Sequence, residues 1–105
     1  MVVVRVLFPI QGLEMDDFNK KMMSSVPKYE GLNGLIRKYY VVADDKSQAG
    51  GIYLWETRDI AESWYNPEWI AYMTEVFGEA PMLEYLDCTI VVDNETQNVT
   101  SKIAA

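Results

Sequence analysis

The sequence predicts an α+β domain with its elements in the order β-α-β-β-α-β. Four segments are rich in β-branched and aromatic residues, which is typical of strands, and two others carry apolar residues three or four positions apart, which is typical of helices. This order is the ferredoxin-like pattern, a four-stranded antiparallel sheet with both helices on one face. The 105 residues suffice for one domain. We expect it to span residues 1–92, followed by a polar C-terminal tail at 93–105.

The first strand is expected at Val2–Phe8, where β-branched residues dominate. A helix follows, because Phe18, Met22 and Val26 recur at intervals of four. Acidic residues lie at its start, where the helix dipole favours negative charge. We expect this helix to end just before Pro27, since proline is poorly tolerated inside a helix.

Two hairpin strands are expected next, at Leu35–Ala43 and Ile52–Glu56, joined by a polar turn. The second helix is expected in two pieces, because Asn66 is a good helix N-cap and Pro67 is tolerated at the first helical position. The last strand is expected at Pro81–Val92.

Gly50 and Gly51 directly precede the third strand. Paired glycines can hold a phosphate, but neither a Walker loop nor a G-x-G-x-x-G motif is present. We therefore expect a β-bulge or a close approach of another backbone at these glycines.

The predicted strands carry apolar residues on both faces. In the first strand Val2, Val4, Val6 and Phe8 share one face, and Val3 and Leu7 lie on the other beside Arg5. Two helices cover only one face of a sheet, so the other face needs a different cover. The simplest cover is a second copy of the chain, and we expect a homodimer in which sheet packs on sheet.

Composition and charge exclude several classes of function. The net charge of −7 repels nucleic acid and anionic membranes. No segment approaches the ~20 apolar residues of a membrane span, and a single cysteine, Cys88, fits a reducing cytoplasm. The chain has no histidine, which excludes a Ser-His-Asp or Cys-His nucleophile and an imidazole-based zinc site. We expect neither a metal nor a cofactor.

Two segments at hairpin spacing, "GLIRKYY" from Gly34 and "AGGIYLW" from Ala49, resemble the dimeric α+β-barrel superfamily. Within it the likeness is to the YdhR-like proteins, described as monooxygenases and related to the antibiotic-biosynthesis monooxygenases and the EthD-type proteins. The resemblance covers nearly the whole chain and implies a ferredoxin-like protomer that dimerises through back-to-back sheets. It implies less about activity, because the superfamily includes cofactor-independent oxygenases, haem-degrading enzymes and isomerases. Its haem-binding and metal-dependent members commonly use a histidine.

Aromatic residues in the middle of the chain predict a small-molecule pocket between sheet and helices. We expect Tyr39, Trp64, Trp69 and Asn66 to contact a small aromatic substrate. The alternative interpretation is that these aromatic side chains only fill the core and the dimer interface.

The predicted activity is cofactor-independent monooxygenation of a phenol, quinol or anthrone-like molecule. A base removes a proton and the resulting anion passes an electron to O2, so the protein supplies desolvation, orientation and anion stabilisation. We expect Glu56 or Tyr72 to handle the proton and Arg37 to stabilise the anion, although Arg37 and Glu56 could instead form an ion pair. Two alternatives remain: a non-catalytic dimer that binds a small aromatic or lipophilic metabolite, and a structural dimerisation domain with a filled interior.

Overall fold

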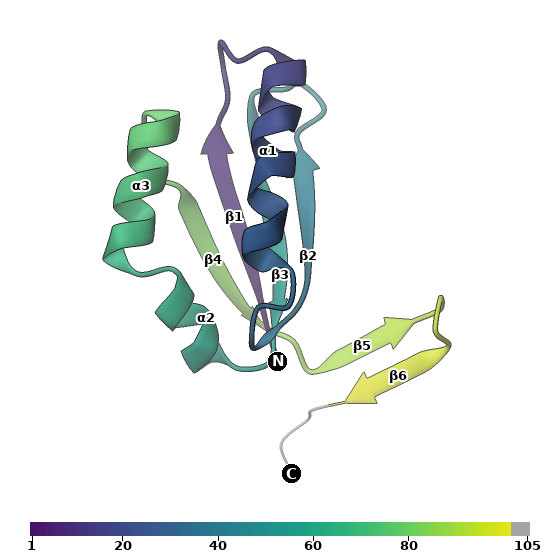
Figure 1. The fold of residues 1–105 in the computed structure, drawn as a ribbon. Coiled ribbons are helices and arrows are strands. Elements are labelled where there is room, and N and C mark those ends of the chain that lie inside the picture. The colour runs from purple at the N-terminus through teal and green to yellow at the C-terminus, as the bar shows by residue number, and fades with distance from the viewer. Residues whose placement is uncertain (102–105) are drawn as a thin grey trace.

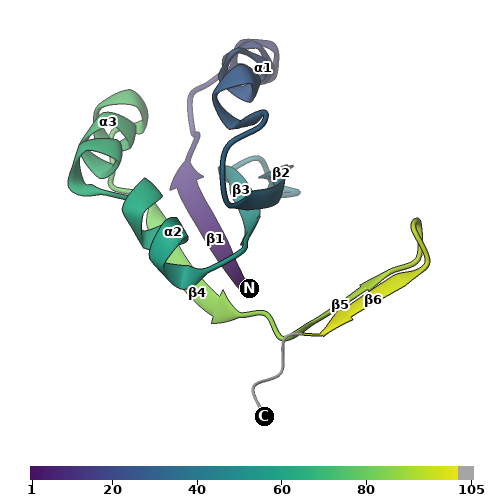
Figure 2. The ribbon, with the colours of Figure 1, turned by 60° about the horizontal axis from the view of Figure 1, so that its bottom comes forward.

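The computed structural model describes residues 1–101. Within them lie a four-stranded antiparallel sheet of order β2-β3-β1-β4, three helices and a two-stranded hairpin. The elements are β1 (Val2–Pro9), α1 (Met15–Tyr29), β2 (Leu35–Val42), β3 (Gln48–Trp55), α2 (Arg58–Trp64), α3 (Pro67–Phe77), β4 (Met82–Asp87), β5 (Ile90–Asp93) and β6 (Asn98–Ser101). The helices cover one face of the larger sheet, and the hairpin β5–β6 projects away from it (Figures 1 and 2). The α+β class and the four-stranded antiparallel sheet are confirmed.

The central strand β1 lies between β3 and β4 and supplies much of the core. Val2, Val4, Val6 and Phe8 are buried under the helices, while the alternate side chains are partly or fully exposed. The predicted apolar face of this strand is therefore confirmed. The outer face of the sheet has no cover within residues 1–101 beyond the hairpin at its end (Figure 2).

Strand β2 changes register at Ile36, which has no partner in the ladder with β3. Such a bulge shifts the side-chain alternation by one position. Beyond it, Lys38 and Tyr40 lie on the helix side of the sheet, and Arg37 and Tyr39 lie on the outer side. Alternation allows only one of the two adjacent tyrosines to face the helices, and it is Tyr40.

Gly50 and Gly51 lie inside β3 rather than before it. A Cβ on Gly50 would overlap the carbonyl oxygen of Val6 and lie 2.7 Å from its carbonyl carbon. The predicted close backbone approach is thus confirmed for Gly50, whereas the bulge lies on β2 instead. A Cβ on Gly51 would lie 2.8 Å from Cε1 of Tyr53 and 3.0 Å from Cε of Lys38, so this glycine leaves room for two side chains.

Helix α1 continues through Pro27 to Tyr29, so the prediction that it ends before the proline is wrong. Pro27 lies in the last turn, where the missing N–H costs one hydrogen bond, to the carbonyl of Met23. The helical hydrogen bonding continues beyond the proline, since the Glu30 N–H donates to the Val26 carbonyl at 3.1 Å. The helix therefore loses a single bond near an end that would fray in any case.

The predicted break between the second and third helices is confirmed. The Asn66 side chain accepts a hydrogen bond from the Trp69 N–H at 2.9 Å, and Pro67 opens α3. Gly78 ends α3 with φ 86°, a left-handed conformation that glycine adopts without steric cost. No helix in the described part of the chain is long and apolar enough to cross a membrane.

The C-terminal segment differs from the prediction of one continuous strand at Pro81–Val92. The strand breaks after β4, and Ile90–Asp93 pairs with Asn98–Ser101 as a hairpin. The Asp93 side chain accepts hydrogen bonds from two backbone N–H groups of the turn, at 3.0 and 3.2 Å. Polar residues of this kind stabilise turns, so part of the predicted polar tail forms β6. The end of the predicted tail, residues 102–105, lies outside the described residues.

Candidate active site

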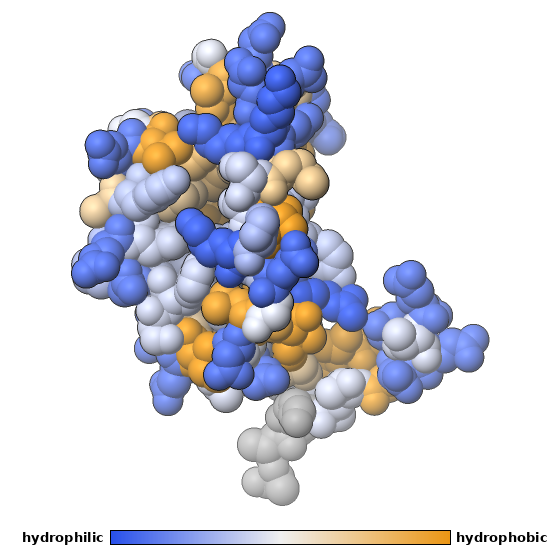
Figure 3. Space-filling model, viewed as in Figure 1, coloured by the Kyte–Doolittle hydropathy of each residue, from blue (hydrophilic) through white to orange (hydrophobic). Residues whose placement is uncertain are grey.

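A cavity of about 440 Å³ opens between the helices and the inner face of the sheet. One wall comes from α1 and the other from α2 and α3, with β1, β2 and β3 as the floor. Residues with hydrophobic colouring are visible between the helices in the space-filling view (Figure 3). The aromatic residues that line it are Phe8, Tyr29, Tyr40, Tyr53, Trp64, Trp69, Tyr72 and Phe77. This size and lining are typical of sites for small, largely apolar ligands.

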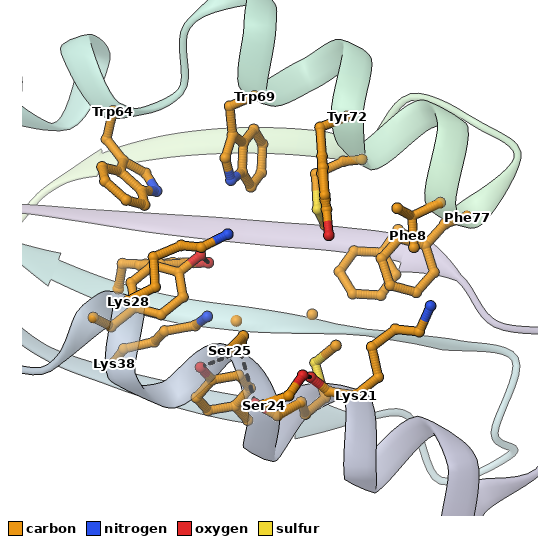
Figure 4. Close-up of a pocket in the computed structure, with 18 of the residues that line it drawn as sticks. Phe8, Lys21, Ser24, Ser25, Lys28, Lys38, Trp64, Trp69, Tyr72 and Phe77 are labelled. Carbon is orange, nitrogen blue, oxygen red and sulfur yellow. Dashed lines mark hydrogen bonds between the residues drawn. The ribbon is translucent and has the colours of Figure 1, made fainter.

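The break between α2 and α3 brings Trp64, Asn66, Trp69 and Tyr72 to one wall of the cavity. The two tryptophans and the tyrosine project from this wall toward the strands and α1 (Figure 4). The indole N–H of Trp64 is buried and has no hydrogen-bond partner among the described residues. A buried donor without an acceptor costs about 1 to 3 kcal/mol, so this group is suited to an acceptor on a ligand.

The floor beneath this wall is a rigid aromatic cluster. The Trp55 indole donates a hydrogen bond to the Tyr65 hydroxyl at 3.1 Å, and both side chains are buried. Tyr53 stacks on Trp55 with ring centroids 6.1 Å apart. Such packing holds the ring of Tyr53 in place where it meets the cavity.

Lys38 lies on the floor with its ammonium group among three tyrosine rings. Its Nζ is 3.6 Å from the ring centroid of Tyr29, 3.8 Å from that of Tyr40 and 4.7 Å from that of Tyr53. No carboxylate within residues 1–101 forms an ion pair with it. Figure 4 shows the side chain pointing into the cavity opposite the tryptophans.

Two effects act on the protonation of Lys38 in opposite directions. Burial, and secondly the charge of Lys28, lowers its pKa to about 7. The three rings favour the ammonium form through cation–π attraction. Burial also raises the pKa of Tyr40 and Tyr53, so their hydroxyls are neutral at the pH where the lysine titrates.

Two further lysines reach across the cavity from α1. Lys21 Nζ is 5.9 Å from the ring centroid of Phe77, and Lys28 Nζ is 5.3 Å from that of Tyr72, both rings being on α3. Glu68 is the one carboxylate among the described residues that line the cavity. A cationic pocket in a protein of net charge −7 is suited to an anionic or acidic ligand.

Arg37, Tyr39 and Glu56 lie outside this cavity, which corrects the expectation that one pocket holds all the predicted residues. The bulge turns Arg37 and Tyr39 to the outer face, where Arg37 donates to the Tyr39 hydroxyl at 3.2 Å and pairs with Asp93 at 3.4 Å. The hydrogen bond with Tyr39 raises the pKa of Arg37. Glu56 is exposed, and it shares with Arg37 a separate hollow beside the hairpin, whose lining is partly polar and partly apolar.

Lys38 is the residue that the sequence analysis missed. A usable signal existed, because a lysine two positions before Tyr40 shares its strand face. Lys38 places a charge on the strand face that the helices cover. Burying a charge there costs free energy, so a lysine at this position is a candidate for a functional role. No group of three or more His, Cys, Asp or Glu side chains within residues 1–101 is placed to hold a metal ion.

The comparison with known families agrees with the resemblance seen in the hairpin. A family model described as "Putative mono-oxygenase ydhR" matches residues 3–80. The chain belongs to this family. The part that matches the ydhR model runs from β1 to the end of α3 and contains every residue that lines the cavity. No curated protein matches the chain.

Proposed function

We propose that this protein is a cofactor-independent monooxygenase that oxidises a small aromatic molecule in the cavity between sheet and helices. The observation that carries the proposal is an aromatic-lined cavity of about 440 Å³ in a chain of the ydhR family. The substrate ring would stack against Trp64, Trp69 and Tyr72, whose side chains share one wall.

The chemistry needs no external reductant. A substrate with an acidic proton forms an anion, and the anion passes an electron to O2. In an anthrone-like substrate the methylene carbon becomes a carbonyl, one oxygen atom enters the product and the other leaves as water, with all electrons supplied by the substrate. The protein would supply desolvation, orientation and stabilisation of the anion.

The proposed roles follow the placement of the residues. Tyr72 would contact the substrate, since its ring lines the cavity. Asn66 positions the residues of the same wall by capping α3. Arg37 and Glu56 have no place in it, because they line the hollow on the other side of the sheet. Tyr39 lies on that outer side as well.

Oxygen uptake with quinol and anthrone substrates tests the proposal. Trp64→Ala and Trp69→Ala should each reduce kcat/KM by about fivefold, because stacking of an aromatic ring contributes on the order of 1 kcal/mol. Arg37→Ala is the matched control and should retain activity. The site assignment is refuted if Arg37→Ala abolishes uptake while both tryptophan variants retain it.

A non-catalytic binding protein remains the second candidate, because the same cavity would serve it. Binding of aromatic ligands without oxygen uptake or product formation would select it. A domain that only dimerises has no need of such a cavity.

We also propose a ferredoxin-like protomer that forms a homodimer through the outer face of the sheet. This face carries half-exposed apolar side chains, as a sheet-on-sheet interface requires: Val3, Leu7, Ile52 and Leu54. Native mass spectrometry should give about twice the 12.1 kDa of the monomer. Ile52→Asp should shift the population to monomer, because it places a charge in the centre of the interface. A monomeric parent protein at micromolar concentration would refute this.

A further inference from the structure

We propose that Lys38 is the proton acceptor of the site and that the ligand is a hydroxyaromatic compound held as its anion beside the lysine. This inference rests on the proposed function, which it deepens by naming the residue that accepts the proton of the substrate.

The first support is the position of the lysine. Its Nζ lies among three neutral rings at 3.6 to 4.7 Å and has neither an ion-pair nor a hydrogen-bond partner among the described residues. A charge held in this way lacks a counterion, and an anionic ligand would supply one.

The second support is the set of donors around the cavity. The buried indole N–H of Trp64 lacks an acceptor. Lys28 and Lys21 bring two more positive charges from α1, against one carboxylate, Glu68. An oxyanion on an aromatic ring would satisfy the donor with its oxygen while its ring contacts the apolar wall.

The proton transfer itself balances without any other reagent. The O–H bond of the ligand breaks, an N–H bond forms on the neutral amine of Lys38, and an oxyanion–ammonium pair results. The neighbouring tyrosine rings attract the ammonium and not the amine, so they stabilise the product of the transfer. Lys28 opposes a charge on Lys38 in the empty site, and a pKa of about 7 leaves part of the lysine as the neutral base near neutral pH.

Gly51 makes this position available to the lysine. A Cβ there would lie 3.0 Å from Cε of Lys38 and 2.8 Å from the Tyr53 ring. The stem of the lysine therefore runs over bare backbone, which brings the amine to the floor of the cavity.

The experiment uses 3-nitrophenol, which is mainly un-ionised near neutral pH and whose phenolate absorbs visible light. The full-length protein is titrated with the probe without oxygen at about pH 7, and tryptophan fluorescence measures how much is bound. The expected result is a bound probe that shows the phenolate band, with its apparent pKa lowered by about one unit or more, a factor of about ten in the ionisation constant. Lys38→Met should bind the probe in its neutral form. Lys20→Met, at an exposed position on α1 away from the cavity, should behave as the parent protein.

Lys38→Arg separates proton acceptance from charge. Arginine stays protonated, so binding of the phenolate should release up to one proton to a weakly buffered solution. In the parent protein about half of Lys38 is neutral at this pH, so about half of that proton should stay on the lysine and the release should be about half as large. Any of four results would overturn the inference. The parent protein could bind the probe in its neutral form or not bind it at all. Lys38→Met could show the phenolate band at full strength, or Lys38→Arg and the parent could release equal amounts of proton. Oxygen uptake is measured separately. Uptake that survives in Lys38→Met leaves the proposed oxygenation standing and overturns the role of the lysine.

Discussion

Lys38→Met should raise the stability of the protein below about pH 7 and flatten its dependence on pH. Burial first, and Lys28 second, lowers the pKa of Lys38 from 10.5 to about 7. Between these values the unfolded chain binds the proton more tightly than the folded one, so the free energy of unfolding rises with pH. Below about pH 7 the cost of the buried charge is fully present, and above 10.5 it is absent.

The magnitude follows from the same two values. Their separation, at about 1.4 kcal/mol per pH unit, sets an upper limit of about 5 kcal/mol. The side chain is only partly buried, and each ring contact of the ammonium offsets about 0.5 to 1 kcal/mol of the cost. We therefore expect the buried charge of Lys38 to lower the free energy of unfolding by about 1 to 2 kcal/mol below about pH 7.

Urea unfolding of the parent protein and of Lys38→Met at about pH 6 and about pH 9 measures this difference. The stability gained by the variant should be larger at the lower pH by about 0.5 to 1 kcal/mol, because pH 9 lies only about halfway between the two pKa values and the rest of the cost is still present there. Lys20→Met is the matched control for replacing a lysine by methionine at an exposed position. If the gain is the same at both pH values, the lysine does not carry a buried charge and the reasoning is refuted.

Three further predictions concern the elements that build the site. Gly50→Ala should destabilise the protein by about 2 to 4 kcal/mol, seen as a lower Tm, because its Cβ would overlap the Val6 carbonyl oxygen; an unchanged Tm contradicts the backbone approach. Gly51→Ala should displace Lys38 from the tyrosine rings and weaken binding of 3-nitrophenol severalfold, measured by titration with tryptophan fluorescence. An unchanged affinity would contradict the claim that Gly51 makes room for Lys38. Asn66→Ala should cost about 1 kcal/mol in urea unfolding through loss of the helix cap, whereas Asn66→Asp, which keeps an acceptor, should cost less; equal losses would exclude the cap as the cause.

Part of the candidate site was predictable because its signals are local. The cap at Asn66 depends on a few neighbouring residues, and it positions Trp64, Trp69 and Tyr72 on one wall. The close approach at Gly50 was also predictable in kind, since a glycine inside a strand usually has such a cause.

The strand face on which Arg37, Lys38 and Tyr39 each lie was not predictable in the same way, although the sequence shows that Lys38 shares a face with Tyr40. The bulge at Ile36 decides which residues share the face of Leu35, and it depends on the pairing of two strands. Without a bulge, alternation along β2 would place Tyr39 on the same face of the sheet as Leu35. With the bulge, Lys38 and Tyr40 lie on that face instead.

Local residue chemistry is enough to predict the α+β class, the apolar inner face of β1 and the break before α3, because each depends on side chains within a few positions of one another. Tertiary structure alone decided that Lys38 sits among Tyr29, Tyr40 and Tyr53 from three different elements, and that β5 turns back to pair with β6. Strand register and packing decide which residues far apart in the chain lie close together. A shift of the register by one residue moves a side chain to the other face of the sheet.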